Sequence, residues 1–122
     1  MPDKNSFTAC KQTIELLKQA GEEDIIICLL SGGASSLWAD TPEGIHESDL
    51  LIVFNTLLNC GATIHENNTI RKHLSKIKGG QLVRYAPFSK WFSLIISDVV
   101  DDDISVIASG PTAPDNSTFS DA

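Results

Sequence analysis

The chain has little of what marks secreted, fibrous or membrane-spanning proteins. Only five prolines and eight glycines occur among its 122 residues, so the composition excludes a collagen-like or disordered chain. The longest apolar run, Ile25–Leu30, is far shorter than the roughly 20 residues that a membrane-spanning helix needs. No charged-then-apolar signal segment opens the chain. We therefore expect a soluble, cytoplasmic protein with no membrane partner.

Cysteines are also few, and they lack the spacing of a redox or zinc motif. Cys10, Cys28 and Cys60 form no CxxC pair, and two of them lie inside apolar stretches. We expect all three to be reduced residues of the core. With 42% hydrophobic and 20% charged residues the chain should form such a core, and its length limits it to one domain.

Cations are scarce, and most of them lie in one segment. The chain has 9 Lys and Arg against 16 Asp and Glu, a net charge of −7. Residues 67–97 nevertheless contain six of the nine cations and no acidic residue. The six are Arg71, Lys72, Lys76, Lys78, Arg84 and Lys90.

This basic segment could bind a small anion. Arg71, Lys72 and His73 share one helical turn and Lys78 follows them, so they could gather a carboxylate or phosphates. The alternative is a solvated basic helix that pairs with acids elsewhere. Nucleic acid is not expected, because the chain is acidic overall and no stacking aromatics interleave with the basic residues.

Hydrophobic spacing predicts helices that alternate with strands. The expected elements are a helix that begins between Asp3 and Ser6 and stops at Gly21, a strand at Ile25–Leu30, a helix from Asp49 to about Cys60 with Ser48 as its N-cap, a helical stretch from Glu66 to about Ala86 broken at Gly79–Gly80, a strand at Trp91–Ser97 and a loop from Asp98 to Asp121.

This order favours an α/β fold with parallel strands in three layers. Ile25–Leu30 is apolar on both faces, which is typical of a strand buried between two helical layers. Two strands are too few for a complete sheet, which usually has about five or six. We therefore expect an incomplete domain, either part of a larger one or one that needs a partner chain.

A glycine- and serine-rich turn follows the first strand. In open α/β sheets, ligands bind beyond the carboxyl ends of the strands, where this turn lies. Residues 31–36, which read Ser31, Gly32, Gly33, Ala34, Ser35 and Ser36, offer three hydroxyls and backbone N–H groups that could face a phosphate. The turn matches no general nucleotide or hydrolase fingerprint, so a simple tight turn is the alternative.

Acidic residues follow the second strand. Asp98 and Asp101–Asp103 place four carboxylates within six residues. Such oxygens suit Mg²⁺, and a carboxylate at a strand end can take a proton from a hydroxyl group. Asp98, the nearest to the strand end, is the strongest candidate. For Asp101–Asp103 a solvated acidic loop is the alternative.

Three stretches are distinctive when taken together, namely Ser31–Leu37, Gly61–Gly80 and Ser97–Thr112. In order and spacing they strongly resemble the glycerate 2-kinase family, whose members carry a C-terminal MOFRL domain. The resemblance extends from about Asp3 to Ala122. It implies that residues 1–122 are part of a Rossmann-like N-terminal domain, with the MOFRL domain absent.

The resemblance also implies phosphoryl transfer from ATP, with Mg²⁺, to the 2-hydroxyl group of D-glycerate. Some members bear an older hydroxypyruvate reductase name, but this chain has no dinucleotide fingerprint and we favour the kinase. The implied site residues are Asp98, Arg71 and Lys72 for catalysis, Ser31, Gly32, Gly33, Ala34, Ser35 and Ser36 for phosphate, Asn68, His73 and Lys78 for substrate, and Asp98 for metal.

The expected partners are D-glycerate and the remainder of the enzyme or a partner chain, and the sheet edges could also support a homo-oligomer. The isolated chain is expected to be inactive. The alternative is a non-catalytic α/β fragment that binds a small anion or a partner chain.

Overall fold

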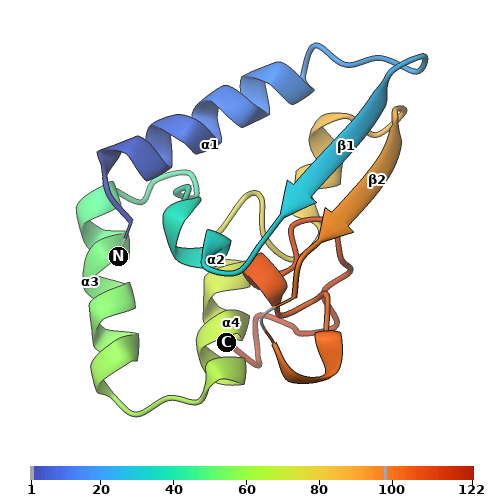
Figure 1. The fold of residues 1–122 in the computed structure, drawn as a ribbon. Helices are drawn as coiled ribbons and strands as arrows, with labels where there is room; N and C mark the ends of the chain where they lie inside the picture. The colour runs from blue at the N-terminus through green and yellow to red at the C-terminus, as the bar shows by residue number, and fades with distance from the viewer. Residues whose placement is uncertain (1, 98) are drawn as a thin grey trace.

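The structure, a computed structural model, describes residues 2–97 and 99–122 (Figure 1). Its elements are α1 (Lys4–Leu17), β1 (Ile25–Leu30), α2 (Ala34–Leu37), α3 (Glu47–Asn59), α4 (Ile64–His73) and β2 (Lys90–Ile95), with 3₁₀ turns η1 (Gln81–Tyr85), η2 (Val100–Asp102) and η3 (Ile107–Ser109). Among these residues no helix is both long and apolar enough to span a bilayer. The cytoplasmic location stays a prediction.

The two strands form a parallel pair, which confirms the predicted α/β fold. Ile25 lies opposite Lys90 and Leu30 lies opposite Ile95. Because the strands are parallel, their carboxyl ends meet at one edge of the sheet, above α4 in Figure 1. The turn after β1 and the loop after β2 therefore begin side by side.

Only one face of the sheet is covered by helices. Ile26, Cys28 and Trp91 pack against a buried cluster of residues from α1, η1 and the segments on either side of η1, which are Cys10, Leu17, Ile77, Leu82 and Ala86. The opposite face exposes the side chains of Ile25, Ile27, Leu29, Phe92 and Leu94. The prediction that the first strand is buried on both faces is therefore wrong for this chain, because the described residues supply a helical layer on one side only.

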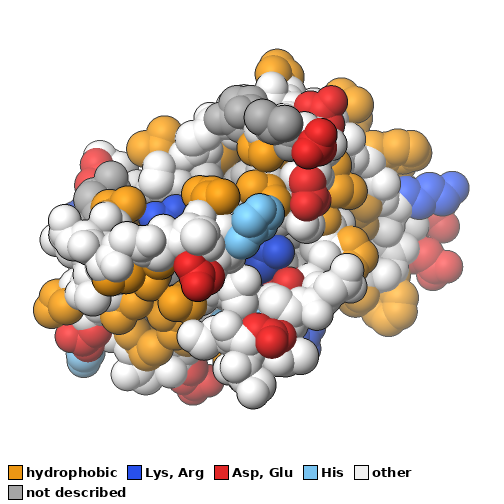
Figure 2. All heavy atoms as spheres, turned by 90° about the horizontal axis from the view of Figure 1, so that it is seen from below, with side chains coloured by type: hydrophobic (Ala, Val, Ile, Leu, Met, Phe, Trp, Pro, Cys, Tyr) orange, Lys and Arg blue, Asp and Glu red, His pale blue; other side chains and the backbone are white. Residues whose placement is uncertain are grey.

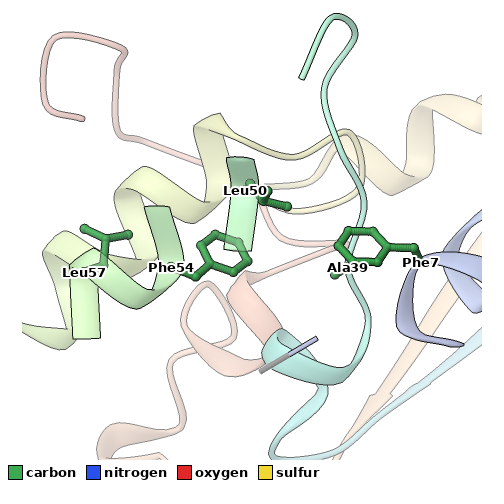
Figure 3. Close-up of a cluster of buried hydrophobic side chains, with 5 residues drawn as sticks. All are labelled: Phe7, Ala39, Leu50, Phe54 and Leu57. Carbon is green, nitrogen blue, oxygen red and sulfur yellow. The ribbon is translucent and has the colours of Figure 1, made fainter. Parts of the chain in front are cut away.

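A second core joins α1 to α3. Leu50, Phe54 and Leu57 recur every three or four residues along one face of α3 and meet Phe7 of α1 and Ala39 (Figure 3). All five are buried. This cluster therefore anchors α3 to the N-terminal half of α1, well away from the exposed face of the sheet (Figure 1).

The ends of the helices follow from capping chemistry. Asp3 caps α1, with its carboxylate accepting from the Ser6 N–H at 2.9 Å, so the helix begins within the predicted range from Asp3 to Ser6. The helix ends at Leu17, before Gly21. The predicted Ser48 cap is wrong, because α3 begins after His46 and acidic residues occupy its first turn, where the helix dipole favours negative charge.

The cysteines are free, but they do not share one environment. Cys10 is buried, Cys28 is half-buried and Cys60 is exposed. The prediction of a core position is thus confirmed for Cys10 and wrong for Cys60, which follows the last turn of α3 and lies outside its apolar face.

Gly79 and Gly80 bring two backbone segments into contact. Both have positive φ, and their N–H groups donate to the carbonyls of Ser109 at 3.0 Å and Gly110 at 2.7 Å. A Cβ atom on Gly80 would lie 2.8 Å from the carbonyl oxygen of Ala113. The glycine pair is required here by close packing of the backbone.

We predict that Gly80→Ala destabilises the chain much more than Gly61→Ala. Both glycines have φ near +80°, which costs about 1–2 kcal/mol for a residue with a Cβ, but the space around Gly61 is open. The clash at Gly80 should add ~1–3 kcal/mol. Thermal unfolding of the two variants followed by circular dichroism measures the difference. Equal destabilisation by the two substitutions would show that the loop at Ala113 can move away from the added Cβ without loss of stability.

Candidate active site

A hollow of about 530 Å³ lies where the turn after β1, α4 and the loop after β2 meet. We call it the site hollow. Its polar lining consists of Gly33, Ser35, His65, Asn68, Arg71, Asp101 and Asp103. On this side of the molecule, acidic side chains border a histidine and a basic side chain (Figure 2). The hollow thus gathers parts of all three stretches that the sequence singled out.

Hydrogen bonds between side chains connect these three segments. The hydroxyls of Ser35 and Ser109 lie 2.6 Å apart, and the Ser109 hydroxyl donates to Oδ1 of Asn68 at 3.3 Å. Because Ser109 uses its proton on Asn68, it accepts from Ser35. Ser109 is fully buried and Asn68 nearly so. The orientations of Ser35 and Asn68 at the site hollow are therefore set by one buried serine.

Arg71 lines the hollow with donors to spare. Its Nε is buried and makes no hydrogen bond within the described part of the chain. Its guanidinium carbon lies 5.1 Å from the centre of the Phe54 ring, and burial lowers the pKa of Arg71. An unpaired guanidinium beside an open hollow is suited to bind a carboxylate or phosphate.

The glycine- and serine-rich turn divides between two hollows. Gly33 and Ser35 line the site hollow, whereas Ser31, Gly32 and Ala34 line an apolar hollow between α1, β1 and α2. The N–H groups of residues 32–34 donate to no partner among the described residues. Gly33 has φ +82°, and a Cβ there would meet nothing within 4 Å. Ser36 turns back, its hydroxyl donating to the Gly33 carbonyl.

Two of the predicted basic residues lie away from the hollow. The Lys72 Nζ lies 3.3 Å from Oδ1 of Asp115 in a largely buried ion pair. Burial acts to raise the pKa of Asp115, but hydrogen bonds from Ser117 and the charge of Lys72 outweigh it and lower that pKa. His73 bonds the Thr69 carbonyl through Nδ1 and meets the Phe119 ring edge-on. Lys72 therefore pairs with an acidic residue far along the chain, Asp115, which is the alternative that the sequence left open for the basic segment.

Lys78 lies beneath the turn, outside the lining of the site hollow. Its side chain is buried, and Nζ donates to the carbonyls of Ser35 at 2.9 Å and Trp38 at 3.1 Å. Burial is the main cause that lowers the pKa of Lys78 to about 8. Its contacts are with the turn itself.

The acidic loop is only partly at the hollow. Asp98 lies outside the described residues. Asp101 and Asp103 line the hollow, and hydrogen bonds from the side chain and backbone of Ser105 lower the pKa of Asp103. Within residues 2–97 and 99–122 no three acidic, histidine or cysteine side chains form a metal cluster. The Mg²⁺ site stays a prediction.

Sequence reasoning gave no role to Ser109 or Asp115. Ser109 lies in the motif that ends at Thr112, but nothing in its neighbours signals a buried hydroxyl. Ser109 and Ala108 both have positive φ, at 60° and 54°, conformations that non-glycine residues adopt rarely. Only the folded backbone reveals that these residues are held at the hollow.

Comparison with known proteins places the whole chain in one family. Residues 1–122 match the family model described as a domain of unknown function, DUF4147. A glycerate 2-kinase from Pyrococcus horikoshii is 47% identical over 122 residues, all of this chain and 28% of that protein. An Agrobacterium vitis protein with a provisional hydroxypyruvate reductase name is 46% identical, again over all of this chain and 28% of the relative.

A solved structure agrees with the fold. The crystal structure of a glycerate kinase from Thermotoga maritima superposes with a TM-score of 0.94 at 43% identity, over 100% of this chain and 30% of that one. The chain therefore spans less than a third of the length of the relatives it matches.

We predict that Lys72→Met lowers the free energy of unfolding by about 1–3 kcal/mol, because it leaves the half-buried Asp115 carboxylate with only its hydrogen bonds from Ser117. Lys76→Met removes the same charge from an exposed position four residues away and should stay within about 0.5 kcal/mol of the parent chain. Chemical denaturation compares the two. Matching stabilities would show that the ion pair contributes nothing.

Proposed function

The chain belongs to the DUF4147 family, and from that membership we propose that its site hollow is part of the active site of a glycerate 2-kinase. The reaction is transfer of a phosphoryl group from ATP to the 2-hydroxyl group of D-glycerate. One observation carries the proposal. Arg71, whose buried Nε has no hydrogen-bond partner among the described residues, and the open turn at Gly33 line the same hollow, which suits an anionic substrate beside a phosphate.

Arg71 is the residue that we assign to the anion. Its planar guanidinium can bond two oxygens of the glycerate carboxylate or of the transferring phosphoryl group. The Phe54 ring beneath it limits where it can move. Phosphoryl transfer depends mainly on positioning and on neutralising charge, so a guanidinium held in this way serves both needs.

The turn after β1 is assigned to phosphate. Residues 32–34 present N–H groups that have no partner in the described part of the chain, and no described atom lies within 4 Å of a Cβ on Gly33, which leaves room for an oxygen-rich group. The Ser35 hydroxyl, held by Ser109, stands at the same rim. Fixed dipoles of this kind stabilise developing charge without reorganising.

We assign the carboxylates to Mg²⁺ binding and to removal of the proton of the 2-hydroxyl group. Mg²⁺ in such enzymes is usually held by one or two carboxylates together with phosphates and water, and Asp101 and Asp103 at the rim fit that donor set. When bound, it would supply positive charge against the phosphates. Asp98 stays our candidate for this role or for taking the proton of the 2-hydroxyl group.

A reductase is the second candidate, because two of the relatives carry that name. The chemistry differs, since a hydroxypyruvate reductase needs a bound nicotinamide. The two activities are separated by supplying hydroxypyruvate with NADH in one assay and D-glycerate with ATP in another.

We predict kinase activity for a chimera in which residues 1–122 replace the matching segment of the Thermotoga maritima glycerate kinase. The backbones agree at a TM-score of 0.94, so the graft should fold. Formation of 2-phosphoglycerate is expected, and none is expected from residues 1–122 alone. A folded chimera that reduces hydroxypyruvate and phosphorylates nothing would overturn the proposal, and turnover by the isolated chain would refute its inactivity.

We predict that Arg71→Met in this chimera raises KM for D-glycerate by about 10-fold to 100-fold, the loss expected for one charged contact. Arg84→Met is the control, because Arg84 is exposed on η1 and should leave KM unchanged. Steady-state kinetics at saturating ATP gives both values. If the two variants behave alike, Arg71 is a packing residue.

A further inference from the structure

Lys78 is a buried cation whose contacts are backbone carbonyls. Only 2% of its surface is exposed, and no carboxylate among the described residues lies within ion-pair distance of its Nζ. The partners of Nζ are the carbonyls of Ser35 and Trp38. The charge of Asp40 favours the ammonium form of Lys78, but burial outweighs it. Burying an ammonium group without a direct ion pair is costly, so a lysine at this position calls for a physical reason.

The reason lies in the short helix α2. Four residues are too few for a helix to hold itself, and the Gly33 N-cap contributes no side-chain hydrogen bond. Gly32 and Gly33 before it are exposed and conformationally free. The carbonyls of Ser35 and Trp38 lie toward the end of this helix, where intrahelical donors run out. Lys78 supplies the donors that they lack.

Ser35 is thereby held from two sides. Lys78 bonds its carbonyl at 2.9 Å, and Ser109 bonds its hydroxyl at 2.6 Å. Lys78 itself is fixed, because its backbone N–H donates to the Ser75 hydroxyl, which in turn donates to Asp40. The turn therefore takes its position from residues more than 40 positions along the chain.

We propose that Lys78 is a positioning residue, which fixes Ser35 and Gly33 at the rim of the site hollow through the Ser35 and Trp38 carbonyls and does not touch the substrate. The inference rests on the proposed function, since the turn that Lys78 holds is the one assigned to phosphate. It gives a different role from the direct substrate contact that the sequence suggested for Lys78.

The first test compares Lys78→Met with Lys76→Met in the chimera. Methionine fills the same space without donors, and Lys76 is exposed two residues away. We expect Lys78→Met to raise KM for ATP by about tenfold or more and to leave KM for D-glycerate within about twofold, because Arg71 is untouched. Lower kcat with both KM values unchanged would mean fewer folded molecules and would overturn the proposal.

A double-mutant cycle identifies the route of the effect. If Lys78 acts through Ser35, then Lys78→Met combined with Ser35→Ala should lose much less than the product of the two single losses in kcat/KM for ATP. Lys78→Met combined with Arg84→Met should lose the full product. Independent effects of Lys78 and Ser35 would overturn the proposal.

Hydrogen exchange tests the same idea without turnover. Amides of residues 31–38 should exchange faster in the folded fraction of Lys78→Met than in Lys76→Met, while α3 exchanges equally in both. Unchanged exchange in residues 31–38 would overturn the role of Lys78. A chimera with no kinase activity would instead reject the proposed function, and the exchange result would still stand as a test of Lys78.

Discussion

The site depends on the close approach of two backbones, Gly79–Gly80 and Ser109–Pro111. The N–H groups of Gly79, Gly80 and Leu82 donate across this contact to the carbonyls of Ser109, Gly110 and Pro111. A Cβ on Gly80 would collide with the backbone carbonyl of Ala113. Ser109, which accepts from Gly79 in this contact, also bonds Asn68 and Ser35, so two glycines that do not line the hollow help to set its geometry.

The fold was predictable to the extent that it follows hydrophobic spacing and capping. The strand Ile25–Leu30, and the start of the first helix between Asp3 and Ser6, were predicted from local residues alone. The exposed face of the sheet was not predictable in the same way. Hydrophobic spacing identifies the apolar side chains that must be buried. It does not show whether the element that buries them belongs to the same 122 residues. Ile27 and Leu29 are apolar in the pattern and exposed in this chain.

The three sequence motifs indicated the residues that line the hollow better than the cluster of cations did. Ser35, Asn68 and Arg71 line the same hollow, and their roles there stay predictions. Lys72 belongs to the same basic cluster, yet its partner is Asp115, 43 residues further along. A count of cations cannot distinguish a ligand contact from an ion pair, because the distinguishing feature is a partner that only the fold supplies. Ser109 lacked a signal for the same reason.

The loop that lines the hollow shows why local rules fail there. Asp101, Asp102, Ala108 and Ser109 all have positive φ without being glycine, and each such residue costs of order 1–3 kcal/mol. The conformational preferences of these residue types would not predict positive φ at these positions. Around Ser109 this backbone is supported by hydrogen bonds from Gly79 and Gly80 and by the bond from the Ser109 hydroxyl to Asn68. The strain is concentrated at the hollow and part of its support, from Gly79 and Gly80, lies outside it, so the geometry of this site depends also on residues that do not line it.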